Sequence, residues 1–215
     1  MKVFYAVLAS VLFAAGVARA ADAPAPAAAT DDPSALVKGV AEAMLKDLDA
    51  DRAELRKDPS KVNALVEKHL LPSFDTKYAA RLVLGRHWRD ATPEQRDRFV
   101  DAFYKSLLRN YGNALVEFTS DKLKVFPSQV DAKAENATVR TEVKRSNGTR
   151  IPVNYTLHKT PDGWKAWDVV IEGISYVKSF REDFGAEIDQ KGLDSVIDRI
   201  EKGGVPVAAG KAASS

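Results

Sequence analysis

The chain has 215 residues, with 32 lysines and arginines against 30 aspartates and glutamates, and it contains no cysteine. The absence of cysteine excludes disulfide bonds, thiol catalysis and thiolate metal sites. The near balance of charge argues against nucleic acid as a partner, since binding to phosphates needs a basic surface.

The first 20 residues have the pattern of a secretory signal peptide. Lys2 supplies the positive charge, an uncharged apolar run follows, and Ala18-Arg19-Ala20 fits a small-x-small cleavage site. The apolar run is short for a membrane span of about 20 residues, so a cleaved leader is favoured over an anchor. Cleavage removes Lys2 and Arg19 and no acidic residue, so the mature chain is expected to carry no net charge.

Composition divides the remaining chain into three parts. Residues 21–32 are rich in alanine and proline and are predicted to form a disordered lead-in, and residues 203–215 a flexible tail of small residues. Residues 33–202 are predicted to form one domain, which is large enough to bury a core without disulfides.

The first half of the domain is predicted to be helical. Asp32-Pro33 and Asp58-Pro59 each begin a helix, because aspartate is a good N-cap and proline is favoured in the first turn. A third, short helix ends at Gly85, since glycine commonly terminates helices.

The fourth predicted helix is the most informative segment. Thr92–Gln95 is a capping box, with threonine as N-cap, proline at the first helical position and glutamine three residues after the cap. The spacing predicts a long amphipathic helix with a strongly aromatic face. The apolar side chains that recur at every fourth residue are Phe99, Phe103, Leu107, Tyr111 and Leu115.

The second half changes to the alternating pattern of β-strands. A short strand at Leu123–Val125 precedes three strands around Val139–Val143, Ile151–Leu157 and Trp167–Ile171, and Asn147-Gly148 predicts a two-residue hairpin turn. Gly173 is expected to end the last strand. The alternation places Trp167, Val169 and Ile171 on one face of the last strand, and it indicates an antiparallel sheet with one buried face.

Two further helices are predicted after the strands. Ser175 is expected to cap a helix over residues 176–190, and a sixth helix contains Leu193 to Ile200. The order of elements predicts an α+β fold, in which helices pack on one face of a curved antiparallel four-strand sheet. The helices and the sheet would enclose an apolar pocket.

The residues that could carry catalysis or bind a metal do not form a recognisable site. His69, His87 and His158 have no second ligand at helical or strand spacing, so we expect structural or solvated roles and no metal or cofactor. Asp168 and Glu172 could be an acidic pair, but the alternation places both away from the buried face. A structural role, such as capping the next helix, is favoured for them, and the sequence indicates binding rather than catalysis.

Four separate sequence segments resemble those of a known family. The string LGxxWRxATPEQRxxFxxxFxxxLxxxY (Leu84–Tyr111) is similar to the characteristic region of the MlaC, or toluene-tolerance, family of periplasmic phospholipid-binding proteins. The blocks LLPSFD (Leu70–Asp75), WDVVIEGIS (Trp167–Ser175) and FREDF (Phe180–Phe184) match in kind and order. The resemblance covers roughly residues 34 to 202.

The resemblance implies a fold, a compartment and partners. The fold would be similar to the nuclear-transport-factor cone with extra helices, and the protein would be a periplasmic monomer without catalytic activity. It would carry phospholipid between an outer-membrane MlaA–porin complex and an inner-membrane ABC transporter, docking transiently on the MlaD subunit, and so maintain outer-membrane lipid asymmetry.

The lipid would occupy an apolar pocket between the aromatic helix and the buried sheet face. A diacyl lipid has about 30 methylenes, each costing ~0.8 kcal/mol to expose to water, so a carrier must cover both chains. The residues expected to line this pocket are Leu84, Trp88, Phe99, Phe103, Leu107, Tyr111, Val139, Val153, Tyr155, Trp167, Val169, Ile171, Ile174 and Val177.

Two alternatives stay open from the sequence. One is an isomerase-like enzyme on the cone fold, which would need a carboxylic base inside the pocket, and the other is a scaffold with a filled core and no lipid. Arg89, Arg96 and Arg181 are candidates for head-group or docking contacts, although a solvated role is favoured for all three.

Overall fold

The computed structural model describes residues 31–116, 119–128, 130–131, 133–144 and 147–204. The predicted signal peptide, residues 21–30 of the lead-in and residues 205–215 of the tail lie outside these ranges, as do the side chains of residues 59, 111–114 and 120. Within the described ranges, no helix has both the length and the apolar composition that a membrane crossing requires.

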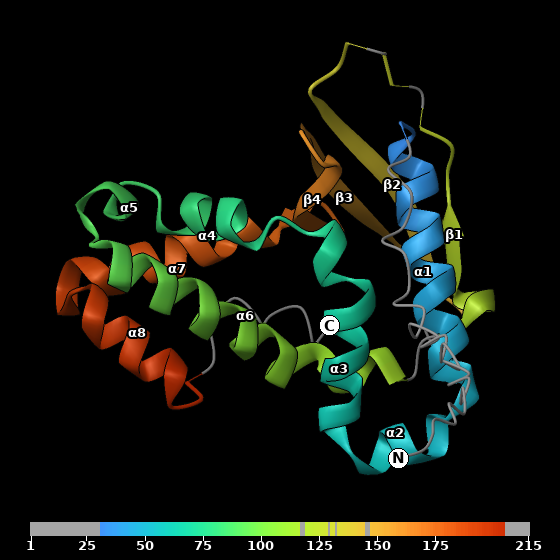
Figure 1. Cartoon of the computed structure of the whole chain (residues 1–215), viewed down its shortest axis with the longest axis horizontal. Helices are drawn as coiled ribbons and strands as arrows, with labels where there is room; N and C mark the ends of the chain where they lie inside the picture. Colours follow the sequence, from blue (N-terminus) through green and yellow to red (C-terminus); the bar gives the residue numbers. More distant parts are fainter. Residues whose placement is uncertain (1–30, 117–118, 129, 132, 145–146, 205–215) are drawn as a thin grey trace, which may run out of the picture.

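The described chain is an α+β fold with eight α-helices and a five-stranded antiparallel sheet (Figure 1). Short 3₁₀ turns occur at η1 (Leu71–Ser73) and η2 (Ser120–Lys122). The helices are α1 (Pro33–Ala50), α2 (Arg52–Lys57), α3 (Pro59–His69), α4 (Thr76–Leu84), α5 (His87–Asp90), α6 (Pro93–Val116), α7 (Tyr176–Lys191) and α8 (Leu193–Glu201).

The predicted helix starts are confirmed by side-chain hydrogen bonds to the backbone. Asp32 Oδ1 accepts from the Ser34 N–H at 2.8 Å. In the capping box of α6, the Gln95 N–H donates to Thr92 Oγ1 at 3.2 Å and the Thr92 N–H donates to Gln95 Oε1 at 3.0 Å. The short helices α2 and α5 were not predicted, because neither is long enough to show a helical period.

The strands are paired in sequential order, so the sheet is a meander. A hairpin joins the second and third strands as predicted, but the prediction of a two-residue turn at Asn147-Gly148 is wrong, because Lys144 pairs with Arg150 and residues 145–149 connect the strands. A fifth strand was not predicted: Glu172 and Gly173 both have positive φ (51° and 84°), as in a type I′ turn, and return the chain along its neighbour. The strands are β1 (Leu123–Val125), β2 (Asn136–Lys144), β3 (Arg150–Thr160), β4 (Gly163–Ile171) and β5 (Ile174–Ser175).

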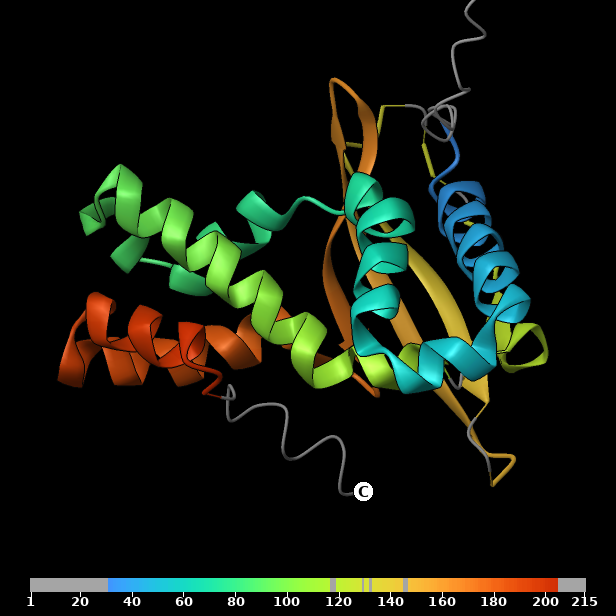
Figure 2. The ribbon, with the colours of Figure 1, turned by 60° about the horizontal axis from the view of Figure 1, so that its bottom comes forward.

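The helices form two groups around the sheet (Figures 1 and 2). Helix α1 covers one face of the sheet, where Leu36 and Val37 pack against apolar residues of the strands. Helices α4, α7 and α8 pack with the first half of α6 as a bundle beside β4, and the second half of α6 packs against α3. Helix α6 therefore connects the bundle with the group formed by α1, α2 and α3.

Each part of this arrangement has its own buried apolar cluster. The "bundle core" contains Ala79, Ala80, Val83, Leu84, Phe99, Ala102, Phe103, Val177, Phe180, Phe184, Ile188, Val196, Ile197 and Ile200. The "sheet core" contains Ala137, Val139, Leu157, Trp164 and Ala166. A third cluster joins α1, α2 and α3 to the end of α6. Half-buried Phe74 packs against both the bundle core and the sheet core, and it therefore marks the boundary between them. We call this boundary the "seam".

Candidate functional site

The aromatic stripe of α6 lies at the centre of the bundle core. Phe99 and Phe103 stack with ring centroids 5.6 Å apart, and Phe180 and Phe184 of α7 meet them edge to face. These arrangements suit the ring quadrupoles and add to the free energy of burial. The FREDF block, which includes both α7 phenylalanines, therefore supplies the second half of an aromatic cluster that α6 begins.

The predicted pocket residues of the helices occupy different depths. Leu84, Phe99, Phe103 and Val177 are buried in the bundle core. Leu107 and Trp88 are half-buried against that core. The exposed fraction of Ile174 is 57%, because β5 lies at the sheet edge, and the side chain of Tyr111 lies outside the described residues.

The predicted pocket residues of the strands share one face of the sheet. Val139 pairs with Tyr155 and Tyr155 with Val169, while Val153 pairs with Ile171, and paired residues of antiparallel strands project to the same side. Val139 and Val153 are buried, whereas the other three side chains are half-buried. Burial raises the pKa of Tyr155 above its ordinary value, so this phenol stays neutral.

Trp167 departs from the predicted alternation because a β-bulge interrupts β4 at this residue. Thr156 pairs with Asp168 and Leu157 with Ala166, so Trp167 is the unpaired extra residue. The prediction that Trp167 simply shares a strand face with Val169 is therefore wrong. Its half-buried side chain packs against the bundle core, at the seam.

Asp168 is buried, which corrects the prediction that it avoids the interior. Its exposed fraction is 4%, because α7 begins directly beside it. Oδ2 accepts from Ser175 Oγ at 2.6 Å and Oδ1 accepts from the Val177 N–H at 3.0 Å. The predicted role as a cap for the next helix is confirmed. Each oxygen accepts one of these hydrogen bonds, so the carboxylate has a structural role at the start of α7.

The three histidines all contact an aspartate through Nε2. Because each ring is more than four-fifths buried and joins two elements, these contacts are structural links. Across the described residues, no three histidine, aspartate or glutamate side chains gather closely enough to hold a metal ion. The contacts are His69 with Asp47 at 2.8 Å, His158 with Asp75 at 3.0 Å and His87 with Asp189 at 3.5 Å.

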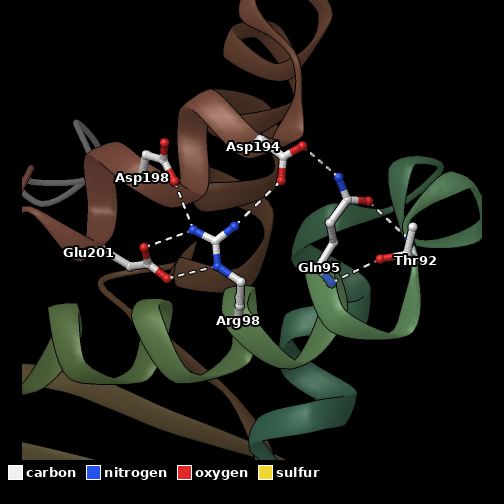
Figure 3. A network of polar contacts seen from close by, with 6 residues as sticks. All are labelled: Thr92, Gln95, Arg98, Asp194, Asp198 and Glu201. Atoms are coloured by element: carbon white, nitrogen blue, oxygen red, sulfur yellow. Dashed lines mark hydrogen bonds and ion pairs between the residues drawn. The ribbon is translucent and has the colours of Figure 1, made fainter.

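Charged side chains hold α8 over α6 along the outer side of the bundle (Figure 3). The Arg98 guanidinium bonds to Asp198 at 2.7 Å and to Glu201 at 2.9 Å, and hydrogen bonds from Arg98 to these carboxylates raise its pKa. Gln95 Nε2 donates to Asp194 Oδ2 at 2.9 Å, so the capping box is tied to the same helix. Arg98 therefore links α6 to α8 within the bundle.

The predicted arginines have different surroundings. Arg96 is not solvated as expected: its Nε donates to the Trp88 carbonyl oxygen at 2.8 Å and its guanidinium lies 5.3 Å from the Trp88 ring centroid. Arg89 and Arg181 are exposed. The Arg181 side chain crosses the C-terminal glycine of α4, where a Cβ on Gly85 would come within 2.8 Å of its Nε.

Two hollows on the surface are lined by residues other than those predicted to form the pocket. One has a volume of about 220 Å³ and lies between α4 and α6, where Lys77, Asp97 and Asp101 line it. The other, of about 700 Å³, lies along α8 and is lined by Asp198 and Arg199 among others. Neither is lined by a residue predicted to contact lipid.

A model of the family described as MlaC protein matches residues 38–202, which is most of the chain. The chain belongs to the MlaC family. A member from Pseudomonas putida, the toluene tolerance protein ttg2D, is 32% identical over 173 residues, which cover 79% of this chain and 80% of the relative. The intermembrane phospholipid transport system binding protein MlaC of Haemophilus influenzae is 23% identical over 205 residues, covering 94% and 93% of the two chains.

A solved structure of a lipid-bound protein has a fold similar to that of this MlaC-family chain. The phospholipid-binding protein of Ralstonia solanacearum, in complex with a phospholipid, is 27% identical, with a TM-score of 0.74. The similarity covers 85% of this chain and 99% of that one. The MlaC assignment therefore rests on sequence and on fold.

Sequence reasoning missed several residues of the seam in this MlaC-family chain. Phe74 lies in the LLPSFD block, and its position between two cores depends on the bridge that it forms, directly after η1, with Ala166 of β4. Tyr78 contacts both Trp167 and His158 through its ring. The aromatic composition of these blocks was the available signal, but it does not show which rings meet.

Proposed function

We propose that this chain carries phospholipid through the periplasm, between an outer-membrane MlaA–porin complex and an inner-membrane ABC transporter that contains MlaD. Membership of the MlaC family and a similar fold with bound phospholipid support this function, and the lipid-bound relative is the observation that carries it. The signal-peptide pattern of residues 1–20 supports export to the periplasm.

The free energy of lipid transfer explains why a carrier is needed. Exposing about 30 methylenes costs on the order of 20 kcal/mol, so a phospholipid does not leave a bilayer unaided at a useful rate. A carrier lowers this cost by covering the chains with apolar side chains. It must still release the lipid, so the binding surface should resemble a bilayer interior rather than a charged pocket.

The seam is the proposed place for the acyl chains. Tyr155, Val169 and Ile171 keep accessible surface on the sheet side, and Leu107 and Trp167 keep some on the bundle side. Side chains such as Phe99 and Val139, fully covered by protein, would form the walls behind them. Entry of two chains would require the bundle and the sheet to separate along the seam, exchanging protein contacts for lipid contacts.

An enzymatic function has less support. The described interior near the seam contains the carboxylate of Asp168, and both of its oxygens accept hydrogen bonds that hold the start of α7. A general base must come within hydrogen-bond reach of its substrate, and Asp168 could not turn toward one without losing these contacts. Binding without bond-making is therefore the function that these residues favour.

Native mass spectrometry on protein purified from a periplasm without detergent tests the proposal. We expect one bound mass equal to a diacyl phospholipid, lost on organic extraction. Protein that carries no lipid and also fails to take lipid from vesicles would overturn the carrier function.

A pair of variants tests the location. Val169→Asp places a charge on the sheet face that we propose contacts the acyl chains, where burial without a partner is costly, and this variant should purify without lipid. Val170→Asp is the matched control, because Val170 pairs with Asn154 and Ser175 on the opposite face, and it should keep its lipid. Equal lipid content in the two folded variants would exclude the seam as the place where the lipid binds.

A further inference from the structure

The indole N–H of Trp167 is the feature of the seam that packing alone does not explain. Its Nε1 is completely enclosed and has no hydrogen-bond partner. On the same strand, Trp164 Nε1 donates to the Asp31 carbonyl oxygen at 3.0 Å. Buried donors in native proteins are nearly always satisfied, and a phenylalanine at residue 167 would supply apolar packing without an unpaired donor.

The ring of Trp167 is held in a defined position rather than left adaptable. The bulge anchors both neighbours: the Ala166 carbonyl oxygen accepts from the Asp75 N–H at 2.7 Å, and Asp168 binds the start of α7. The Tyr78 ring lies edge-on at 5.7 Å, and it is itself packed against His158. Such bulges commonly re-aim a side chain next to a functional site.

The charges around Trp167 determine which kind of acceptor suits it. The indole is a donor only, so it needs an oxygen acceptor from the ligand. Asp168 follows Trp167 in the chain, and the backbone of Asp75 is bonded to Ala166 on the other side of Trp167. Negative charge on these neighbours disfavours a phosphate, whose burial would also require a cation. Arg81 lies over the ring of Tyr78, 4.9 Å from its centroid, but its own side chain is exposed. A neutral carbonyl oxygen fits the site better.

We infer that the Trp167 indole N–H donates a hydrogen bond to an ester carbonyl oxygen of the bound phospholipid. This inference rests on the proposed carrier function and adds a contact to it. The contact sets the depth of the ligand, with the glycerol backbone at Trp167, the acyl chains within the seam and the head group toward solvent. The protein would thus recognise the ester linkage, which all diacyl phospholipids share, and accept different head groups.

Lipids that lack the carbonyl groups provide the test. Wild type is incubated with vesicles holding equal amounts of dioleoyl phosphatidylethanolamine and its dioleyl ether analogue, and native mass spectrometry gives the ratio bound. We expect wild type to prefer the ester lipid about tenfold, the effect of roughly one buried hydrogen bond. Trp167→Phe should take the two lipids about equally.

Trp164→Phe is the matched control, because the same substitution on the same strand removes an N–H that already has a protein acceptor. It should keep the preference of wild type for the ester lipid. If wild type binds both lipids equally, or if Trp167→Phe keeps the preference, the inference is overturned and the carrier function stands. If wild type binds neither lipid, the carrier function fails and the inference falls with it.

A second measurement covers the case in which Trp167→Phe does not fold. The chain has three tryptophans, so three indole N–H signals are expected in a nitrogen–proton spectrum of labelled wild type. The Trp167 signal, assigned by elimination with Trp88→Phe and Trp164→Phe, should move downfield with ester lipid and not with ether lipid. The same shift with both lipids would mean that water or another oxygen is the acceptor, and would overturn the inference.

Discussion

Replacing Gly85 by alanine should destabilise the protein, mainly through its backbone. The residue ends α4 with φ of 55° and ψ of −119°, a combination that residues with a Cβ rarely adopt. Holding another residue in such a sparsely populated region costs about 1–3 kcal/mol. The new Cβ would also lie 2.8 Å from Arg181 Nε, but that long side chain can move away. For a protein of this size we expect Tm to fall by about 2–12 °C.

Urea unfolding followed by circular dichroism, with and without Arg181→Ala, separates the two causes. If the backbone dominates, Gly85→Ala loses nearly the same free energy of unfolding in both backgrounds. Gly39→Ala is the control, since Gly39 lies within α1 with nothing within 4 Å of a new Cβ, and it should be neutral or slightly stabilising. An unchanged midpoint for Gly85→Ala, or a penalty that disappears entirely with Arg181→Ala, would refute the backbone argument.

Three further substitutions test the packing and the caps. Phe184→Ala removes a fully buried ring from the bundle core and should lower the free energy of unfolding by about 3–5 kcal/mol in urea titrations. Asp168→Ala leaves the Val177 N–H without its acceptor and should cost about 1–3 kcal/mol by the same assay, whereas a null effect would show that the cap is dispensable. Burial opposes ionisation of Glu187, but hydrogen bonds from Arg199 outweigh it and hold the pKa of Glu187 below its ordinary value. Because that pKa is lowered on folding, the stabilisation is present above the unfolded pKa and lost as pH falls through the folded one. Glu187→Gln should therefore be less stable than wild type near neutral pH by about 0.5–1 kcal/mol, and a gap that persists at strongly acid pH would contradict this.

The parts of the fold that depend on local interactions were predictable from sequence. Asp32 and Ser175 cap helices because their side chains bond to backbone N–H groups two or three residues away. The shared face of Val139, Tyr155 and Val169 follows from the period of two in a strand. These interactions involve few residues, all visible in a short stretch of the chain.

The parts that depend on distant partners were not predictable. The bulge at Trp167 exists only relative to β3, so no alternation within β4 alone could reveal it. The burial of Asp168 depends on where α7 begins, and the division of the apolar residues between two cores depends on how α6 crosses the molecule. Which of the predicted pocket residues contact lipid therefore stays a prediction.

The order of elements in the bundle determines how this protein must fold. Helix α6 packs Phe99 and Phe103 against phenylalanines of α7, yet all five strands lie between these two helices in the chain. The α7 side chains that cover Phe99 and Phe103 are therefore synthesised only after the whole sheet. Closing such long loops is slow, and apolar surface stays exposed meanwhile. A chain that emerges from a membrane N-terminus first would thus display an uncovered aromatic face until Tyr176 and later residues arrive. Nascent protein should depend on a holding chaperone in its compartment, and truncation before α7 should yield aggregates rather than a smaller folded unit.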